Sequence, residues 1–171
     1  MSHIPIADLP GVLLDALRAC LCTRLADNDA GVCFCSLHFG TYTPAEHCDG
    51  CKDGKCGQAW VRLDRIYPSN QFPAQDARAS CNAPLAAVIE AGVYRCRPTA
   101  DRRGGPPDEA ATTAATLQEV KDAMLIAQAI ACCPEITERP HVLGLWLPHD
   151  AGNCGGGKWT VTVRLSQRTT S

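Results

Sequence analysis

Closely spaced cysteines are the residues of this sequence best placed to do chemistry. The chain has 12 cysteines among 171 residues, and Cys48, Cys51 and Cys56 follow the spacing C-x2-C-x4-C. A C-x2-C pair of thiolates supplies half of the ligands of a tetrahedral zinc site. The sequence has no second C-x2-C pair, so a fourth ligand would come from elsewhere: His47, Cys33, Cys35 or Cys81. Zinc bound at these three cysteines is one hypothesis.

The same cysteines allow a redox or a structural interpretation. A thioredoxin-like pair needs a cysteine at a helix N-terminus, where the helix dipole lowers the thiol pKa, but Asp-Gly pairs at 49–50 and 53–54 predict turns here. A structural role would mean disulfides within the domain, or burial of some cysteines as small apolar side chains. Cys20, Cys132 and Cys133 fit burial, because they lie beside apolar residues in predicted helices. We favour the structural interpretation.

Two other patterns resemble catalytic motifs but lack necessary parts. GNCGGGK at 152–158 has the spacing of a phosphate-binding loop, yet Trp159 follows it instead of a hydroxyl residue that would bind magnesium. An alternating strand also follows, so no helix N-terminus would face a phosphate. His38 has no serine, cysteine or carboxylate at a recognisable triad spacing, and His149 with Asp150 is typical of a solvated loop. We therefore expect no enzyme activity and no cofactor.

Composition limits the class of protein. With 46% apolar residues the chain is globular, and its length suits a single domain over 1–171. The net charge of −2 argues against a protein that grips nucleic acid. The sequence has no apolar run of about 18 residues, which predicts no membrane-spanning helix. Its first residues, MSHIPIADLPG, lack the charged and apolar regions of a signal peptide.

Apolar spacing predicts two helices, at 12–26 and 110–133. The second carries Leu117, Val120 and Met124 at helical spacing, followed by Gln128 and Ala131. Five strands are expected at 32–39, 58–67, 84–97, 142–147 and 158–165. The order α-β-β-β-α-β-β predicts an α+β domain, with a mainly antiparallel sheet and both helices packed on one face. The remaining segments are an N-terminal arm (1–9), a cysteine-rich loop (40–57), a loop (98–109), a flexible glycine-rich hairpin tip (148–157) and a C-terminal tail (166–171).

Three stretches resemble a known family: QAWVRLDRIYPSNQFP (58–73), NAPLAAVIEAGVYRCRP (82–98) and AMLIAQAIACC (123–133). They resemble the head-to-tail connector proteins of long-tailed phages that infect actinobacteria, most closely the tail terminators. The resemblance spans roughly residues 10–165, and the cysteine-rich loop at 40–57 departs from it. It implies a small α+β subunit of a homo-oligomeric ring, commonly hexameric, that caps the tail tube and joins it to the head connector. A stopper or neck protein, or a zinc-stabilised interaction module, is the alternative.

The resemblance also implies partners and a location. The ring would contact the major tail tube protein and a head-side connector or stopper, in the neck of a virion assembled in the host cytoplasm. DNA would pass through the lumen without specific binding, which suits a nearly neutral chain. Such a protein is made in a reducing cytosol and later meets an oxidising environment, so disulfides worth about 2–4 kcal/mol each could form late.

A closed ring requires one face of a subunit to meet a different face of its neighbour. We expect the hairpin tip to contact the tail tube or the next subunit, and the loop at 40–57 to form a second interface. The loop at 98–109 would face the head-side ring or the lumen. The interface candidates are Asp101, Arg102, Arg103, Asp150, Asn153 and Lys158.

Overall fold

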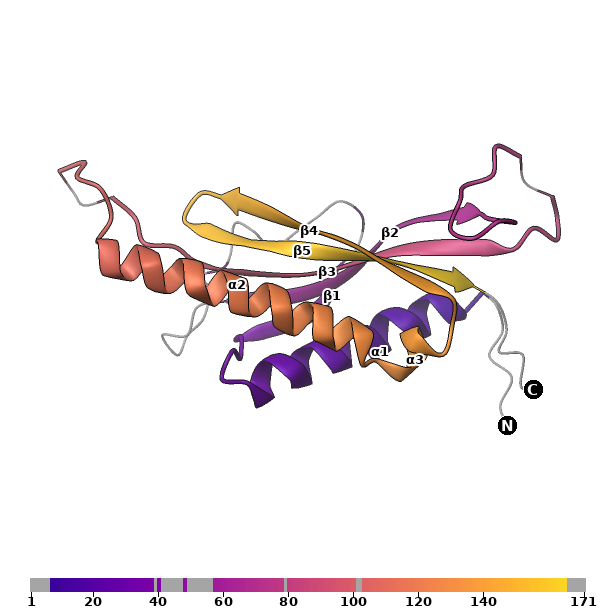
Figure 1. Cartoon of the computed structure of the whole chain (residues 1–171), viewed down its shortest axis with the longest axis horizontal. Helices are drawn as coiled ribbons and strands as arrows, with labels where there is room; N and C mark the ends of the chain where they lie inside the picture. Colours follow the sequence, from indigo (N-terminus) through magenta and orange to yellow (C-terminus); the bar gives the residue numbers. More distant parts are fainter. Residues whose placement is uncertain are drawn as a thin grey trace.

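The computed structural model describes residues 7–38, 40, 48, 57–78, 80–100 and 103–165. Within these ranges the chain forms three helices and five strands (Figure 1). In chain order they are α1 (Leu9–Asp27), β1 (Phe34–His38), β2 (Gln58–Pro68), β3 (Leu85–Cys96), α2 (Glu109–Ala131), α3 (Pro134–Thr137), β4 (His141–Ala151) and β5 (Cys154–Leu165). The predicted α+β order is confirmed, with α3 as an additional single turn that starts at Pro134.

All five strands belong to one sheet in the order β1-β2-β3-β5-β4. The pairs β2–β3, β3–β5 and β4–β5 are antiparallel, which confirms a mainly antiparallel sheet. The short edge strand β1 is the exception, because it pairs with β2 in parallel, from Phe34 opposite Gln58 to His38 opposite Arg62. The last strand in the chain, β5, therefore lies inside the sheet, and β4 forms the edge opposite β1.

Both helices pack on the same face of the sheet, as the sequence predicts (Figure 1). Helix α1 lies mainly against β2 and β1, while α2 lies against β5 and against α1. The core fills the space between them with leucines of α1, aliphatic residues of α2 and alternate residues of the strands: Leu13, Leu17, Leu21, Ile126, Ile130, Val61, Ile89, Val93, Val161 and Val163. Full burial of each large aliphatic side chain contributes about 1.5–3 kcal/mol.

Helix α1 begins three residues before the predicted start. Pro10 lies in its first turn, where a missing backbone N–H costs nothing because that group has no partner within the helix. Leu9 is buried and adds one more turn to the apolar stripe. None of the described helices combines the length and the apolar character needed to cross a membrane.

Helix α2 does not pack against the core through the apolar residues whose spacing predicts the helix. Leu117, Val120 and Met124, whose spacing predicts the helix, are 66%, 58% and 58% exposed. The buried side of α2 consists of Asp122, Leu125, Ile126, Ala129 and Ile130. The helix prediction is confirmed, but its most regular apolar stripe faces away from the core.

The prediction that residues 148–157 form a flexible tip is wrong. Strands β4 and β5 stay paired as far as Ala151 opposite Cys154, so the turn contains only Gly152 and Asn153. Three consecutive glycines at 155–157 belong to β5, where side chains would overlap Arg97, the carbonyl of Val93 and Trp146, respectively. These glycines permit close packing within the sheet and do not indicate flexibility.

Candidate functional site

Disulfides connect segments that are separate in the fold. Cys20 on α1 is bonded to Cys133 at the start of α3, and Cys22 on α1 is bonded to Cys35 on β1. Cys48 is bonded to Cys154 at the start of β5. Two further cysteines, Cys33 and Cys96, are also disulfide-bonded. The structure therefore favours the structural interpretation of the cysteines.

Cys132 corrects one part of that interpretation. The prediction that it is buried is wrong, because Cys132 follows the last residue of α2 and is exposed. Its neighbour Cys133 is fully buried, as predicted. Cys133 is also bonded to Cys20, so it is not buried as a free thiol. Among the described cysteines, Cys81 and Cys132 carry free thiols.

Only one of the three predicted zinc ligands lies within the described residues. Cys48 is buried against Trp60 and Tyr94, and its backbone N–H donates to Cys154 Sγ at 3.3 Å. A sulfur in a disulfide is not a thiolate, so Cys48 cannot bind zinc in this oxidation state. Cys51 and Cys56 lie outside the described residues. Zinc at these cysteines stays a prediction for the reduced chain.

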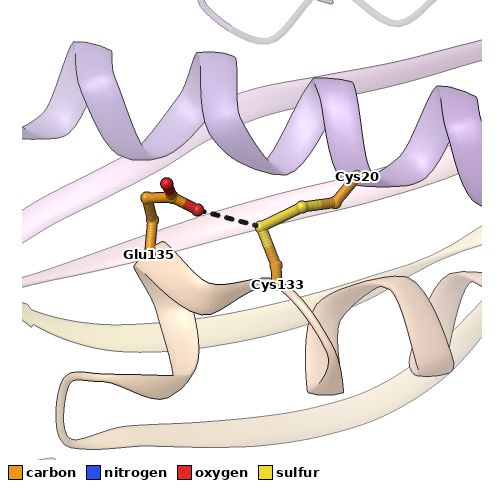
Figure 2. A group of neighbouring side chains, drawn as sticks. All are labelled: Cys20, Cys133 and Glu135. Atoms are coloured by element: carbon orange, nitrogen blue, oxygen red, sulfur yellow. Dashed lines mark hydrogen bonds between the residues drawn. A yellow bond between two sulfur atoms is a disulfide. The ribbon is translucent and has the colours of Figure 1, made fainter.

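A second sulfur cluster, absent from the sequence-based predictions, lies between α1 and α3 (Figure 2). Cys20, Cys133 and Glu135 each place one potential ligand atom within 4.8 Å of the others. Cys133 Sγ lies 3.8 Å from Glu135 Oε2. Pro134 starts the single turn of α3, which brings Glu135 back beside Cys133. No local pattern could indicate this cluster, because Cys20 precedes Cys133 by 113 residues.

The described interface candidates lie in three places in the fold. Asp150 and Asn153 lie together at the end of the β4–β5 hairpin, where Arg97 pairs with Asp150 at 2.8 Å and donates its backbone N–H to Asn153 O at 2.7 Å. Lys158 instead lies in the middle of β5, and Arg103 is exposed in the segment before α2. The remaining two, Asp101 and Arg102, are outside the described residues.

Lys158 belongs to a charged network on the sheet face away from the helices. Its Nζ donates to Glu90 Oε1, and Arg62 Nε donates to Glu90 Oε2, both at 2.6 Å. Glu90 and Arg62 are buried, and the three residues link β5, β3 and β2. Lys158 therefore has a role within the sheet, and its contact with a partner stays a prediction.

His38 has a serine partner that the sequence analysis did not assign. Ser36 Oγ and His38 Nε2 are 2.8 Å apart, since alternate residues of β1 share one face. Burial lowers the pKa of His38. A histidine that stays neutral beside a hydroxyl is only part of a hydrolytic triad, and ordinary strand geometry accounts for this contact.

One edge of the molecule exposes apolar side chains from two elements. Strand β4 is the sheet edge, and Leu145 is 74% exposed there. Helix α2 is close to the same edge, because Trp159 on β5 donates its Nε1–H to Ala123 O at 2.7 Å, and Trp159 also packs against Trp146 on β4. We call the following residues the apolar edge: Leu117, Val120, Met124, Val142, Leu143, Leu145 and Leu147.

The apolar edge lacks the charged side chains that protect many sheet edges. Natural edge strands carry charges, especially lysine, that prevent pairing with other chains. The β4 segment 142–148 reads VLGLWLP and contains no charged residue. A pairing irregularity between Leu143 and Trp146 and the presence of Pro148 distort the strand locally without covering its side chains. Exposed apolar patches of this kind mark contact surfaces.

Comparison with protein families and with curated sequences identifies no relative. No protein-family model matches the chain, and no curated protein matches its sequence. Functional inference therefore depends on the residues and the geometry of this chain.

Proposed function

We propose that this protein is a structural virion subunit of the tail terminator type. It assembles into a ring, commonly of six copies, that caps the tail tube and joins it to the head-side connector. The sequence resemblance suggests this role, and the apolar edge is the structural observation that carries it. Leu117, Val120 and Met124 of α2 are exposed beside the edge strand, and Val142, Leu143, Leu145 and Leu147 are exposed along both faces of that strand. Exposed apolar side chains gathered along one sheet edge favour a contact with another protein.

A copy of the same chain is the partner that this proposal requires. A ring needs two different contact faces on each subunit. The apolar edge on β4 and α2 is one, and the opposite edge of the sheet offers a second, where Phe34 and Leu37 of β1 are exposed. Contact between these two edges in successive subunits would be head-to-tail, which is the arrangement that closes a ring.

The disulfides are consistent with a protein that ends in an oxidising environment outside the cell. Cys20–Cys133 and Cys48–Cys154 each join residues more than 100 positions apart. Such bonds stabilise mainly by restricting the unfolded chain, and they would form after the particle leaves the reducing host cytoplasm. The tail tube protein and the head-side stopper are the expected partners, and DNA passes through the lumen without specific contacts.

Native mass spectrometry and electron microscopy of the purified chain test the ring. We expect a closed ring for the unchanged protein, and monomers for Leu117→Lys and Leu145→Lys, because each places a charge in the contact. Val12→Lys is the matched control: Val12 on α1 is also exposed but belongs neither to α2 nor to an edge strand of the sheet. A monomeric unchanged protein at tens of micromolar, or edge variants that still form rings, would refute the proposal.

A stopper or neck subunit remains the alternative within the same class, because its size and ring assembly are similar. Labelling the protein in intact particles separates the two roles. A terminator lies directly on the tail tube, whereas a stopper lies on the head side of it. Absence of the protein from particles would contradict both.

A further inference from the structure

We propose that the reduced chain binds one zinc ion between Cys20, Cys133 and Glu135. The three side chains come from α1 and from the junction of α2 and α3, and they converge on one point (Figure 2). This site shares no residue with the zinc hypothesis for Cys48, Cys51 and Cys56. It also goes beyond the proposed ring and does not depend on it.

The separation of the ligand atoms suits a zinc site. Zinc binds thiolate sulfur at about 2.3 Å and carboxylate oxygen at about 2.0–2.2 Å, so neighbouring ligands of a tetrahedron lie roughly 3.5–3.8 Å apart. Cys133 Sγ and Glu135 Oε2 are 3.8 Å apart. The Cα atoms of Cys20 and Cys133 are 5.8 Å apart, which places their sulfurs side by side in either oxidation state. Opening the disulfide therefore leaves both thiols beside the carboxylate.

A disulfide offers the Glu135 carboxylate no hydrogen-bond donor. A disulfide sulfur carries no proton, so Cys133 can donate a hydrogen bond to Glu135 only as a thiol. Among the described residues no cation pairs with the Glu135 carboxylate, which is only half-buried, whereas Cys133 is fully buried. A carboxylate beside two thiols opposes their ionisation, since like charges disfavour each other. A divalent cation removes that conflict, because it attracts all three groups.

The donor set selects the kind of ion. Two thiolates and one carboxylate favour zinc over magnesium or calcium, which prefer oxygen ligands alone. Three protein ligands leave the fourth position of the tetrahedron for water. Cys20 and Glu135 are partly exposed, so an ion and its water molecule can reach the cluster from solvent.

Binding requires thiols, which are the normal state of cysteine in a reducing cytosol. As Zn²⁺ binds, the Cys20 and Cys133 thiols each release one proton to solvent, and Glu135 binds through a carboxylate oxygen. No electron is transferred in this step. The disulfide and the zinc complex are thus alternative states of the same two sulfurs, and both tie α1 to α3.

Alkylation measured peptide by peptide tests the site, because it follows Cys20 separately from every other cysteine. The full chain is reduced with a phosphine under nitrogen, freed of metal, and treated with iodoacetamide without Zn²⁺ and with enough Zn²⁺ to fill a second site at Cys48, Cys51 and Cys56 as well. We expect zinc to slow the alkylation of Cys20 at least tenfold. The exposed thiols Cys81 and Cys132 should react at the same rate in both samples.

Two variants make the assignment specific. Glu135→Gln keeps both sulfurs and the side-chain volume, so the protein should fold but need about tenfold more zinc for the same protection of Cys20. Glu109→Gln, an exposed acid in the first turn of α2, is the matched control and should behave like the unchanged chain. The proposal is overturned if zinc leaves Cys20 reactive, if Glu135→Gln retains full protection, or if circular dichroism shows the reduced chain unfolded in the presence of zinc.

Discussion

Arg95 on β3 and Asp122 on α2 form a two-point ion pair that joins the second helix to the sheet. Arg95 Nε donates to Asp122 Oδ2 at 2.5 Å, and Nη2 donates to Oδ1 at 2.9 Å. The same Nη2 group also donates to Ala30 O, and Gln118 donates to Asp122 Oδ1. Asp122 is 1% exposed. The buried charge is thus fully bonded, which is the condition under which it can be tolerated in the interior.

Asp122→Ala should lower the free energy of unfolding by about 3–5 kcal/mol, because it leaves the Arg95 guanidinium without its buried partner. Urea unfolding followed by circular dichroism measures the change. Asp15→Ala is the control, since Asp15 pairs with Arg18 on the exposed side of α1. That pair should contribute less than about 1 kcal/mol. Equal losses for the two variants would contradict a special role for Asp122.

Gly156→Ala should destabilise the sheet, because its added methyl group would overlap the backbone carbonyl of Val93, which cannot move without disturbing the β3–β5 pairing. Overpacking of this kind costs about 1–3 kcal/mol. Gly11→Ala has no heavy atom within 4 Å of the added group. Gly11 lies in the first turn of α1, where alanine should stabilise the protein by less than the roughly 1 kcal/mol expected in a helix interior. Thermal unfolding should therefore shift in opposite directions for the two variants.

These glycines also show what the sequence could and could not predict. The alternation of Trp159, Val161, Val163 and Leu165 identifies the second half of β5. Its first half contains three glycines, which predict a turn, because the sequence does not show which side chains pack against them. In the fold, Trp146, Arg97 and Val93 occupy that space. A local pattern cannot show this, since the packing partners are distant in sequence.

The same reasoning applies to α2 and to the cysteines. Spacing predicts that α2 is a helix, yet it cannot tell which of two apolar faces meets the core. The buried face includes Asp122. Because this residue is charged, a sequence-based assignment would place its face in solvent. Pairing of Cys20 with Cys133 and of Cys48 with Cys154 depends on the arrangement of the elements, which spacing alone does not give.

A disulfide that closes a longer loop should contribute more to the free energy of unfolding than one that closes a shorter loop. Cys22 and Cys35 are 13 residues apart, whereas Cys48 and Cys154 are 106 apart. Chain entropy predicts about 3 kcal/mol for the short loop and about 4.7 kcal/mol for the long one. Replacing each pair by alanine in the oxidised protein, followed by guanidinium unfolding, checks the order. A larger loss from the Cys22 and Cys35 pair would show that local packing outweighs loop length.

Stability should fall in mild acid partly because of His38. Burial lowers its pKa below the ordinary value of 6.5, so the unfolded chain takes up a proton more readily than the folded one. The contribution of neutral His38 is then fully present above pH 6.5 and is lost as the pH falls from 6.5 towards the pKa of the folded state. His38→Gln should reduce the difference in unfolding free energy between pH 8 and pH 5. An unchanged difference would assign the acid sensitivity to other groups.

The place of β5 in the sheet has a consequence for synthesis on the ribosome. This strand is translated after every other described element, yet it lies between β3 and β4 and pairs with both. Until it emerges, β4 has no neighbour and Val161, Val163 and Leu165 are missing from the core that α1 and α2 cover. A nascent chain therefore cannot complete its sheet until its final strand is made, and β4 joins the sheet only through that strand.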